Sequence, residues 1–207
     1  MTLVDRINAG LRRVPTWPFY VIGALPPFWY LYLGFTGGLG AEPISALEHK
    51  LGLLGLQFLL LGLAVTPLRR FAGINLLKFR RAIGLLAFYY ICMHLLTWLV
   101  LDIRDPARIW ADIVKRPYIT VGMVGFVLLV PLAATSNNAS VRRLRARWRQ
   151  LHWLVYPAVI LGAVHFVMLR KGWQGEPLAY LAIAAILLAL RLRIRRSSTM
   201  MGAESGG

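Results

Sequence analysis

The sequence predicts an all-α integral membrane protein, folded as a bundle of six transmembrane helices. Of its 207 residues, 58% are hydrophobic and only 15% are charged, whereas a soluble domain carries about 25% charged residues. The apolar residues form six long runs, and most basic residues form short clusters between these runs. Both observations indicate that lipid, rather than water, surrounds most of the chain.

The net charge of +16 would also suit a protein that binds nucleic acid. Such a domain would present its basic residues on a polar surface around a modest core. Here the basic clusters separate long apolar runs, which is typical of the cytoplasmic loops of membrane proteins. The sequence therefore favours a membrane protein and excludes nucleic acid as the expected partner.

The six apolar runs are the predicted spans, because a helix needs about 20 apolar residues to cross a bilayer. Five runs approach or reach that length, and arginines that reach back toward the interface can extend the shorter sixth. Pro26 and Pro27 in the first run and Pro157 in the fifth are expected to kink their helices rather than end them. The predicted spans are 17–36, 51–68, 82–101, 117–135, 151–169 and 177–190.

The basic residues also predict the direction of the spans, because cytoplasmic loops carry an excess of lysine and arginine. Most of the 24 basic residues lie in the two termini and in the loops after the second and fourth runs. We therefore expect both termini in the cytoplasm. These residues are Arg6, Arg12, Arg13, Arg69, Arg70, Lys78, Arg80, Arg81, Arg142, Arg143, Arg145, Arg147, Arg149, Arg191, Arg193, Arg195 and Arg196.

This arrangement divides the chain into three segments. Residues 1–16 form a basic cytoplasmic N-terminus, residues 17–190 the transmembrane domain, and residues 191–207 a basic cytoplasmic tail that we expect to be disordered. The remaining loops face outward and are too short to fold as domains. They lie near 37–49, 102–116 and 170–176.

Four histidines lie in or beside the predicted spans, at positions 49, 94, 152 and 165. An ionisable group inside a span is costly and is therefore a candidate for function. A single such histidine is explained equally well by a hydrogen bond to a neighbouring helix. Three of them on two helices (His94, His152 and His165) favour a bound cofactor.

His94 and His165 lie at matching depths in the third and fifth spans, which run in the same direction. At 1.5 Å per residue both are ~18–21 Å from the cytoplasmic end. Two imidazoles at one depth can supply both axial ligands of a haem iron. Zinc would need a third or fourth ligand, and only Cys92, the single cysteine, is placed to give one. Without a CxxCH motif for covalent attachment, the pattern predicts a b-type haem between these spans in preference to a metal-free polar network.

His152 is a candidate ligand of a second haem, or part of the site where electrons arrive. It precedes His165 by ~20 Å along the helix axis. The facing positions at the base of the third span are Arg80 and Arg81, which are not usual iron ligands; Arg80 is the nearer of the two to the helix face of His94. An arginine beside a cofactor pairs more naturally with a propionate or a flavin phosphate. The positive-inside bias also explains at least one of these arginines.

His49 lies at the outer end of the second span and cannot pair with His152. It could border the outer haem or a quinone. An interfacial histidine beside Glu48 equally needs no function.

Specific stretches resemble a known family. They are GGLGAEPISALEHKLG at 37–52, RRAIGLLAFYYICMHLLTW at 80–98, KRPYITVG at 115–122 and TSNNASVRRLRARWRQLHWLVYPAVILGAVHF at 135–166. The arrangement resembles the ferric-reductase-like transmembrane domain, whose members stack two b haems between spans three and five on histidine pairs spaced 13 or 14 apart. Over nearly the whole chain these stretches look like the MsrQ (YedZ) family, the haem-binding membrane subunits of bacterial periplasmic methionine sulfoxide reductase systems.

The resemblance implies electron transfer in the bacterial inner membrane, with the substrate-reducing site on a partner protein. Family members take electrons from the respiratory quinone pool or from a cytoplasmic flavin reductase. They pass them through haem b to MsrP, a periplasmic molybdopterin enzyme that reduces methionine sulfoxide and so repairs oxidised periplasmic proteins. Members are also described as binding FMN. The implied cofactors are thus haem b (one or two), FMN, and quinone as donor.

The residues agree with this implication and depart from it at one point. No GxGxxG motif follows a strand, and we expect no cytoplasmic FAD/NADPH domain on this chain. Arg80 and Arg81 stand where the NADPH oxidases, which share the ferric-reductase-like transmembrane domain, carry the partner of the inner histidine, so that ligand pair is incomplete.

Two alternatives stay open. One is a stand-alone ferric or quinol reductase with another acceptor. The other is a small permease or proton channel that uses the histidines as a relay; no Asp or Glu lies within any predicted span, which disfavours it.

Overall fold

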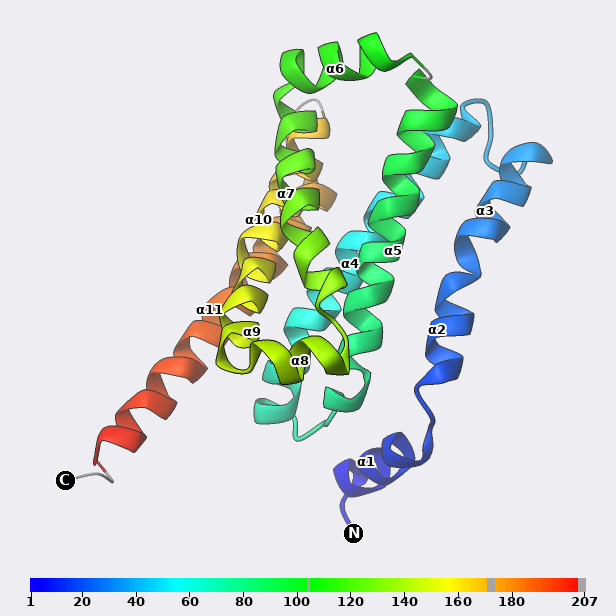
Figure 1. Ribbon diagram of the computed structural model, residues 1–207. Helices are drawn as coiled ribbons and strands as arrows, with labels where there is room; N and C mark the ends of the chain where they lie inside the picture. Colours follow the sequence, from blue (N-terminus) through cyan, green and yellow to red (C-terminus); the bar gives the residue numbers. More distant parts are fainter. Residues whose placement is uncertain (104, 171–173, 205–207) are drawn as a thin grey trace.

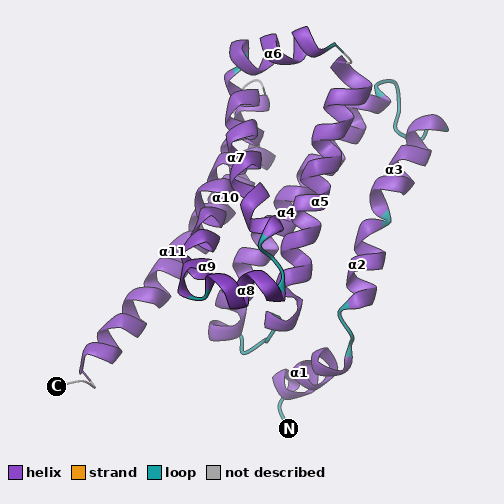
Figure 2. Cartoon of the chain, in the orientation of Figure 1, coloured by secondary structure: helices purple, strands orange, loops and turns teal. Residues whose placement is uncertain are grey.

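The computed structural model describes the backbone of residues 1–103, 105–170 and 174–204, and the side chains of these residues as far as Arg191. Regular structure in the described part of the chain is helical throughout (Figure 2). Five of the 24 basic residues lie outside the described part of the chain. Arg104 and Lys171 lie outside it entirely, and Arg193, Arg195 and Arg196 have side chains outside it.

Four helical stretches of the described chain are long and apolar enough to cross a membrane. The first is α4 (Pro43–Phe71), and the third is α7 (Pro117–Ala134). The second joins a 3-10 turn (η1, Leu77–Phe79), α5 (Arg80–Leu96) and a π-helical segment (η2, Thr97–Ile103). The fourth joins α9 (Ala146–Leu151), a 3-10 turn (η3, His152–Leu154) and α10 (Val155–Leu169). They correspond to the second to fifth predicted spans.

These four stretches pack into a bundle whose closest pairs are α4 with α5 and α7 with α10 (Figure 1). Small side chains on α10 let its neighbours approach, since Ala158 and Ala163 are buried among leucines of α4 and α7. α11 (Gly175–Glu204) covers α10 and α4. Side-chain hydrogen bonds join α4 to α11, from Gln57 Nε2 to the Tyr180 hydroxyl at 2.7 Å and from Arg191 Nη2 to Thr66 Oγ1 at 2.8 Å.

The first predicted span is a kinked pair of helices, α2 (Trp17–Ala24) and α3 (Pro26–Phe35). Leu25 between them keeps helical angles (φ −73°, ψ −37°), so the chain bends without stopping. Pro26 and Pro27 have no N–H to donate to the preceding turn. Two tyrosines of α5 donate hydrogen bonds to backbone carbonyls at the bend. The Tyr90 hydroxyl donates to Gly23 O at 2.7 Å, and the Tyr89 hydroxyl donates to Ala24 O at 3.1 Å. Neither half reaches the length of the four long stretches.

The second expected kink was at Pro157, which lies in the first turn of α10, directly after the 3-10 turn η3. Pro157 cannot donate to the carbonyl of Trp153, four residues earlier, and the helix tightens over that turn. At the C-terminus, α11 extends beyond the predicted 177–190 and continues to Glu204. Its backbone is therefore helical through most of the segment expected to form a disordered tail.

Short helices cover the two ends of the bundle. α1 (Leu3–Arg13), α8 (Asn138–Leu144) and α9 lie at the end that carries both chain termini, whereas α6 (Pro106–Lys115) crosses the opposite end (Figure 1). Lys78 Nζ secures α1 by donating to Arg12 O at 2.9 Å and Val14 O at 2.7 Å. These contacts satisfy carbonyls that the end of the helix leaves free.

Candidate functional site

A cavity opens between α4, α5, α7 and α10, toward the end of the bundle that α6 covers. The empty space in and around it, including open solvent at its mouth, is about 1300 Å³. On α4 it extends from Glu48 to Leu59, which corresponds to ~16 Å along the axis. Leucine, isoleucine, phenylalanine and glycine form most of its wall. The polar lining residues are Glu48, His49, His94, Asp102, Arg116, Tyr118 and His165.

His94 of α5 and His165 of α10 face each other across this cavity. Their ring centroids are 6.3 Å apart and their planes are inclined by 73°. The sequence placed them at one depth, and the structure brings their rings together.

Both imidazoles are held by backbone carbonyls. His94 Nδ1 donates to Glu48 O at 2.9 Å, and His165 Nδ1 donates to Tyr118 O at 2.7 Å. An Nδ1–H that bonds to a carbonyl fixes the tautomer, which leaves the lone pair on Nε2. Each ring is thus prepared as a neutral nitrogen ligand.

The separation of the rings suits a single ion between them. Metal–imidazole bonds of about 2.0 Å, together with about 1.1 Å from each nitrogen to its ring centre, would place the centroids about 6 Å apart. Among the described residues no three His, Cys, Asp or Glu side chains gather as a metal site, so zinc would lack ligands. A haem iron needs only two axial protein ligands. The pair and its apolar surroundings therefore fit haem.

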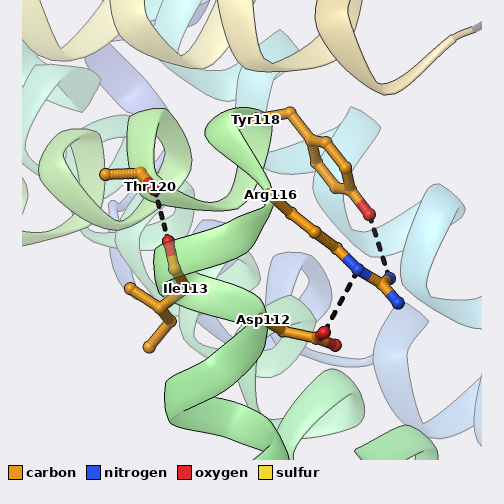
Figure 3. A network of polar contacts seen from close by, with 5 residues as sticks. All are labelled: Asp112, Ile113, Arg116, Tyr118 and Thr120. Atoms are coloured by element: carbon orange, nitrogen blue, oxygen red, sulfur yellow. Dashed lines mark hydrogen bonds and ion pairs between the residues drawn. The ribbon is translucent and has the colours of Figure 1, made fainter.

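The carbonyl that holds His165 belongs to Tyr118, whose side chain takes part in a polar network (Figure 3). The Arg116 guanidinium donates to the Tyr118 hydroxyl at 3.3 Å and lies 3.1 Å from a carboxylate oxygen of Asp112. The Thr120 hydroxyl donates to Ile113 O. The hydrogen bond to Tyr118, with a contribution from Asp112, raises the pKa of Arg116. These contacts tie α6 to the first turn of α7, where Tyr118 lies.

His49 lines the same cavity, close to its mouth. Its Nε2 accepts a hydrogen bond from Arg170 Nη2 at 2.8 Å, and its ring lies 5.4 Å from that of Phe166. It therefore borders the space between His94 and His165 and keeps a partner of its own. A buried carboxylate oxygen of Glu48 has no hydrogen-bond partner among the described residues.

His152 lies apart from this cavity, toward the end with the termini. Its ring stacks on Trp148 at 3.8 Å between centroids, and its Nδ1 donates to Trp148 O at 3.1 Å. Arg80 interacts electrostatically with His152. Arg81 instead donates to Asn138 Oδ1 at 2.7 Å. The structure thus associates His152 with Arg80, and separates both from the pair in the cavity.

Two kinds of group at this site were not predicted from the sequence. One is the pair of carbonyls at Glu48 and Tyr118, and the other is the pair of glycines beside the imidazoles, Gly52 and Gly122. Every residue has a carbonyl, so no side-chain type signals this use. The spacing of four residues from Glu48 to Gly52 and from Tyr118 to Gly122 is visible in the sequence, but its meaning depends on which histidine packs there.

Comparison with known proteins gives the family of the chain. Residues 50–163 match the family model described as the ferric reductase like transmembrane component. The "Protein-methionine-sulfoxide reductase heme-binding subunit MsrQ" of Brucella ovis is 54% identical over 177 residues, which cover 85% of this chain and 80% of the relative. The protein of the same description from Brucella anthropi is 52% identical over the same shares. No solved structure matches.

Proposed function

The chain belongs to the MsrQ family of haem-binding membrane subunits, within the ferric-reductase-like transmembrane proteins, and from this premise we propose that it is a b-type cytochrome. Electrons arrive from the respiratory quinone pool or from a cytoplasmic flavin reductase. They leave through haem b to a periplasmic molybdopterin methionine sulfoxide reductase of the MsrP type. The activity supports the repair of oxidised periplasmic proteins.

The observation that carries the proposal is the facing pair of imidazoles in an apolar cavity. His94 and His165 would hold the haem through Nε2, because each Nδ1 is already bonded to a carbonyl. When bound, haem supplies one-electron transfer. Leucine, isoleucine and phenylalanine side chains form most of the wall around the ligand pair, and a hydrophobic surround tunes the potential of such a centre.

We propose that the end with the termini faces the cytoplasm of a bacterial cell and that the chain spans the inner membrane six times. The kinked pair α2–α3 and the helix α11 supply the first and sixth crossings. An even number of crossings agrees with two termini at one end of the bundle (Figure 1). In this orientation the cavity with His94 and His165 lies toward the periplasm, where a soluble acceptor collects the electrons.

We assign His152 and Arg80 to the cytoplasmic side, at the site where electrons are received, with Arg81 at its edge. No second histidine ring faces His152 among the described residues, so a second haem would need another axial ligand. The positive charge of Arg80 suits the phosphate of FMN or a haem propionate.

The difference spectrum of the purified protein tests the assignment as a cytochrome. We expect a Soret band and an α band that sharpen with dithionite, since two imidazole ligands give a low-spin b haem. A quinol analogue should reduce this haem, and the purified periplasmic reductase with methionine sulfoxide should reoxidise it. A protein without either band would refute the proposal, and a haem that the reductase fails to reoxidise would favour a stand-alone ferric or quinol reductase.

The variant His152→Ala tests the cytoplasmic site separately. We expect an unchanged haem-to-protein ratio and an unchanged dithionite spectrum, because His152 lies outside the cavity of the ligand pair. Reduction by quinol or by a flavin reductase should be slowed at least tenfold. Gln150→Ala, at an exposed position two residues earlier, is the matched control. Loss of haem in His152→Ala would instead make His152 a ligand of a second haem.

A further inference from the structure

Two glycines occupy equivalent positions beside the two imidazoles. Gly52 follows Glu48 by four residues on α4, and Gly122 follows Tyr118 by four residues on α7. In an α-helix the N–H of residue i+4 bonds to the carbonyl of residue i. The carbonyls of Glu48 and Tyr118 therefore each accept two hydrogen bonds. One comes from the backbone N–H of the glycine four residues later, and the other comes from the Nδ1–H of the histidine.

A side chain at either glycine would meet the imidazole itself. A Cβ at Gly122 would lie 2.8 Å from Nδ1 and 3.0 Å from Cε1 of His165. A Cβ at Gly52 would lie 3.1 Å from Nδ1 and 3.3 Å from Cε1 of His94. In each case the first distance is to the nitrogen that donates to the carbonyl. An alanine would therefore force the His165 ring to shift, and would displace the His94 ring by a few tenths of an ångström.

Other glycines of the same helices have different neighbours. A Cβ at Gly62 of α4 would find Ile83 at 3.6 Å, an ordinary contact. A Cβ at Gly55 would lie 2.7 Å from Ile91 Cγ1, so this glycine allows close packing of α4 against an apolar side chain of α5. At Gly52 and Gly122, by contrast, all three of the nearest atoms belong to an imidazole ring. The close approach is therefore specific to the histidines.

We propose that Gly52 and Gly122 are positioning residues for His94 and His165: their missing side chains let each imidazole reach the carbonyl one helical turn earlier, and this bond sets the reduction potential of the haem. A hydrogen bond from Nδ1–H makes Nε2 a more basic ligand. A more basic ligand stabilises ferric iron over ferrous iron. Both glycines thus hold the potential low, which favours delivery of the electron to the acceptor. This inference rests on the proposed haem function.

The test is a redox titration of the haem in Gly52→Ala and Gly122→Ala, with Gly62→Ala as the control on α4. We expect each of the two variants to raise the midpoint potential and to shift the low-spin electron paramagnetic resonance signal, with the larger change at Gly122. Gly62→Ala should leave both unchanged. Helical propensity alone predicts that all three alanines stabilise the helix equally, without any change in the haem.

Gly52→Ala, with its longer contact, keeps the test decisive if Gly122→Ala loses its haem. Bound haem whose potential and spectrum match those of Gly62→Ala would overturn the inference while leaving the cytochrome function intact. If the parent protein binds no haem, the proposed function fails instead. The hydrogen bonds can then be measured by nitrogen-15 chemical shifts of labelled histidine, which should report Nδ1–H in the parent and a changed value in both variants.

Discussion

Replacing either His94 or His165 with alanine is expected to abolish haem binding in the cavity. Loss of an outer hydrogen-bond partner already costs about 10–100-fold in metal affinity, and loss of an axial ligand should cost more. The other histidine of the cavity, His49, already accepts a hydrogen bond from Arg170, so the remaining imidazole would hold the haem alone. The measurement is haem per protein by pyridine haemochrome after purification.

His49→Ala is the matched control for these two variants. His49 lines the same cavity but bonds to Arg170, so its loss should leave the axial ligands in place. Haem content close to that of the parent is expected. If His49→Ala lost as much haem as His94→Ala, or if either ligand variant kept a full low-spin spectrum, the assignment of the axial pair would be wrong.

Thr66→Val is expected to destabilise the fold by about 1–3 kcal/mol, the range for a buried polar group left without its partner. Arg191 is only 7% exposed, and its Nη2 donates to Thr66 Oγ1 at 2.8 Å. Its guanidinium also lies 5.7 Å from the Tyr156 ring. Among the described residues no ion pair compensates its charge. Removing the hydroxyl therefore takes one hydrogen-bond acceptor from a buried cation between α4, α10 and α11 and leaves it with Tyr156.

Arg191→Met should cost far less than Thr66→Val, because it removes the buried charge together with its need for a partner. Thr97→Val is the control at a buried threonine, whose hydroxyl donates to Met93 O one turn earlier in the chain. Thermal unfolding in detergent measures all three variants. Equal losses in Thr66→Val and Thr97→Val would show that the contact with Arg191 contributes nothing.

Much of the membrane domain was predictable from the sequence because its signals are local. Length and hydropathy predicted the four stretches that are confirmed as long enough to cross a membrane, and the family resemblance is confirmed by relatives at 52–54% identity. Proline chemistry predicted a kink at Pro26, and Leu25 keeps helical angles there. The sixfold crossing, the orientation and the ligand roles remain predictions.

Other features required the packed structure. Which tyrosines would satisfy the carbonyls at Gly23 and Ala24 depends on α5 lying beside α2. The contact of Arg191 with Thr66 joins residues far apart in the chain, whereas the sequence predicted Arg191 as part of the basic tail and as an interfacial residue that extends the sixth span. Helix α6, with the network that holds Tyr118, lies in a loop predicted to be merely short.

The sequence by itself determined that the chain belongs in a membrane and that His94 and His165 stand at one depth, because hydropathy and helical rise act along the chain. Only the tertiary structure decided that their rings face each other at 6.3 Å, and that the carbonyls of Glu48 and Tyr118 hold them. The physical reason is that backbone carbonyls are chemically alike. Helix packing selects which of them meets an imidazole, and a glycine one turn later leaves the room for that contact.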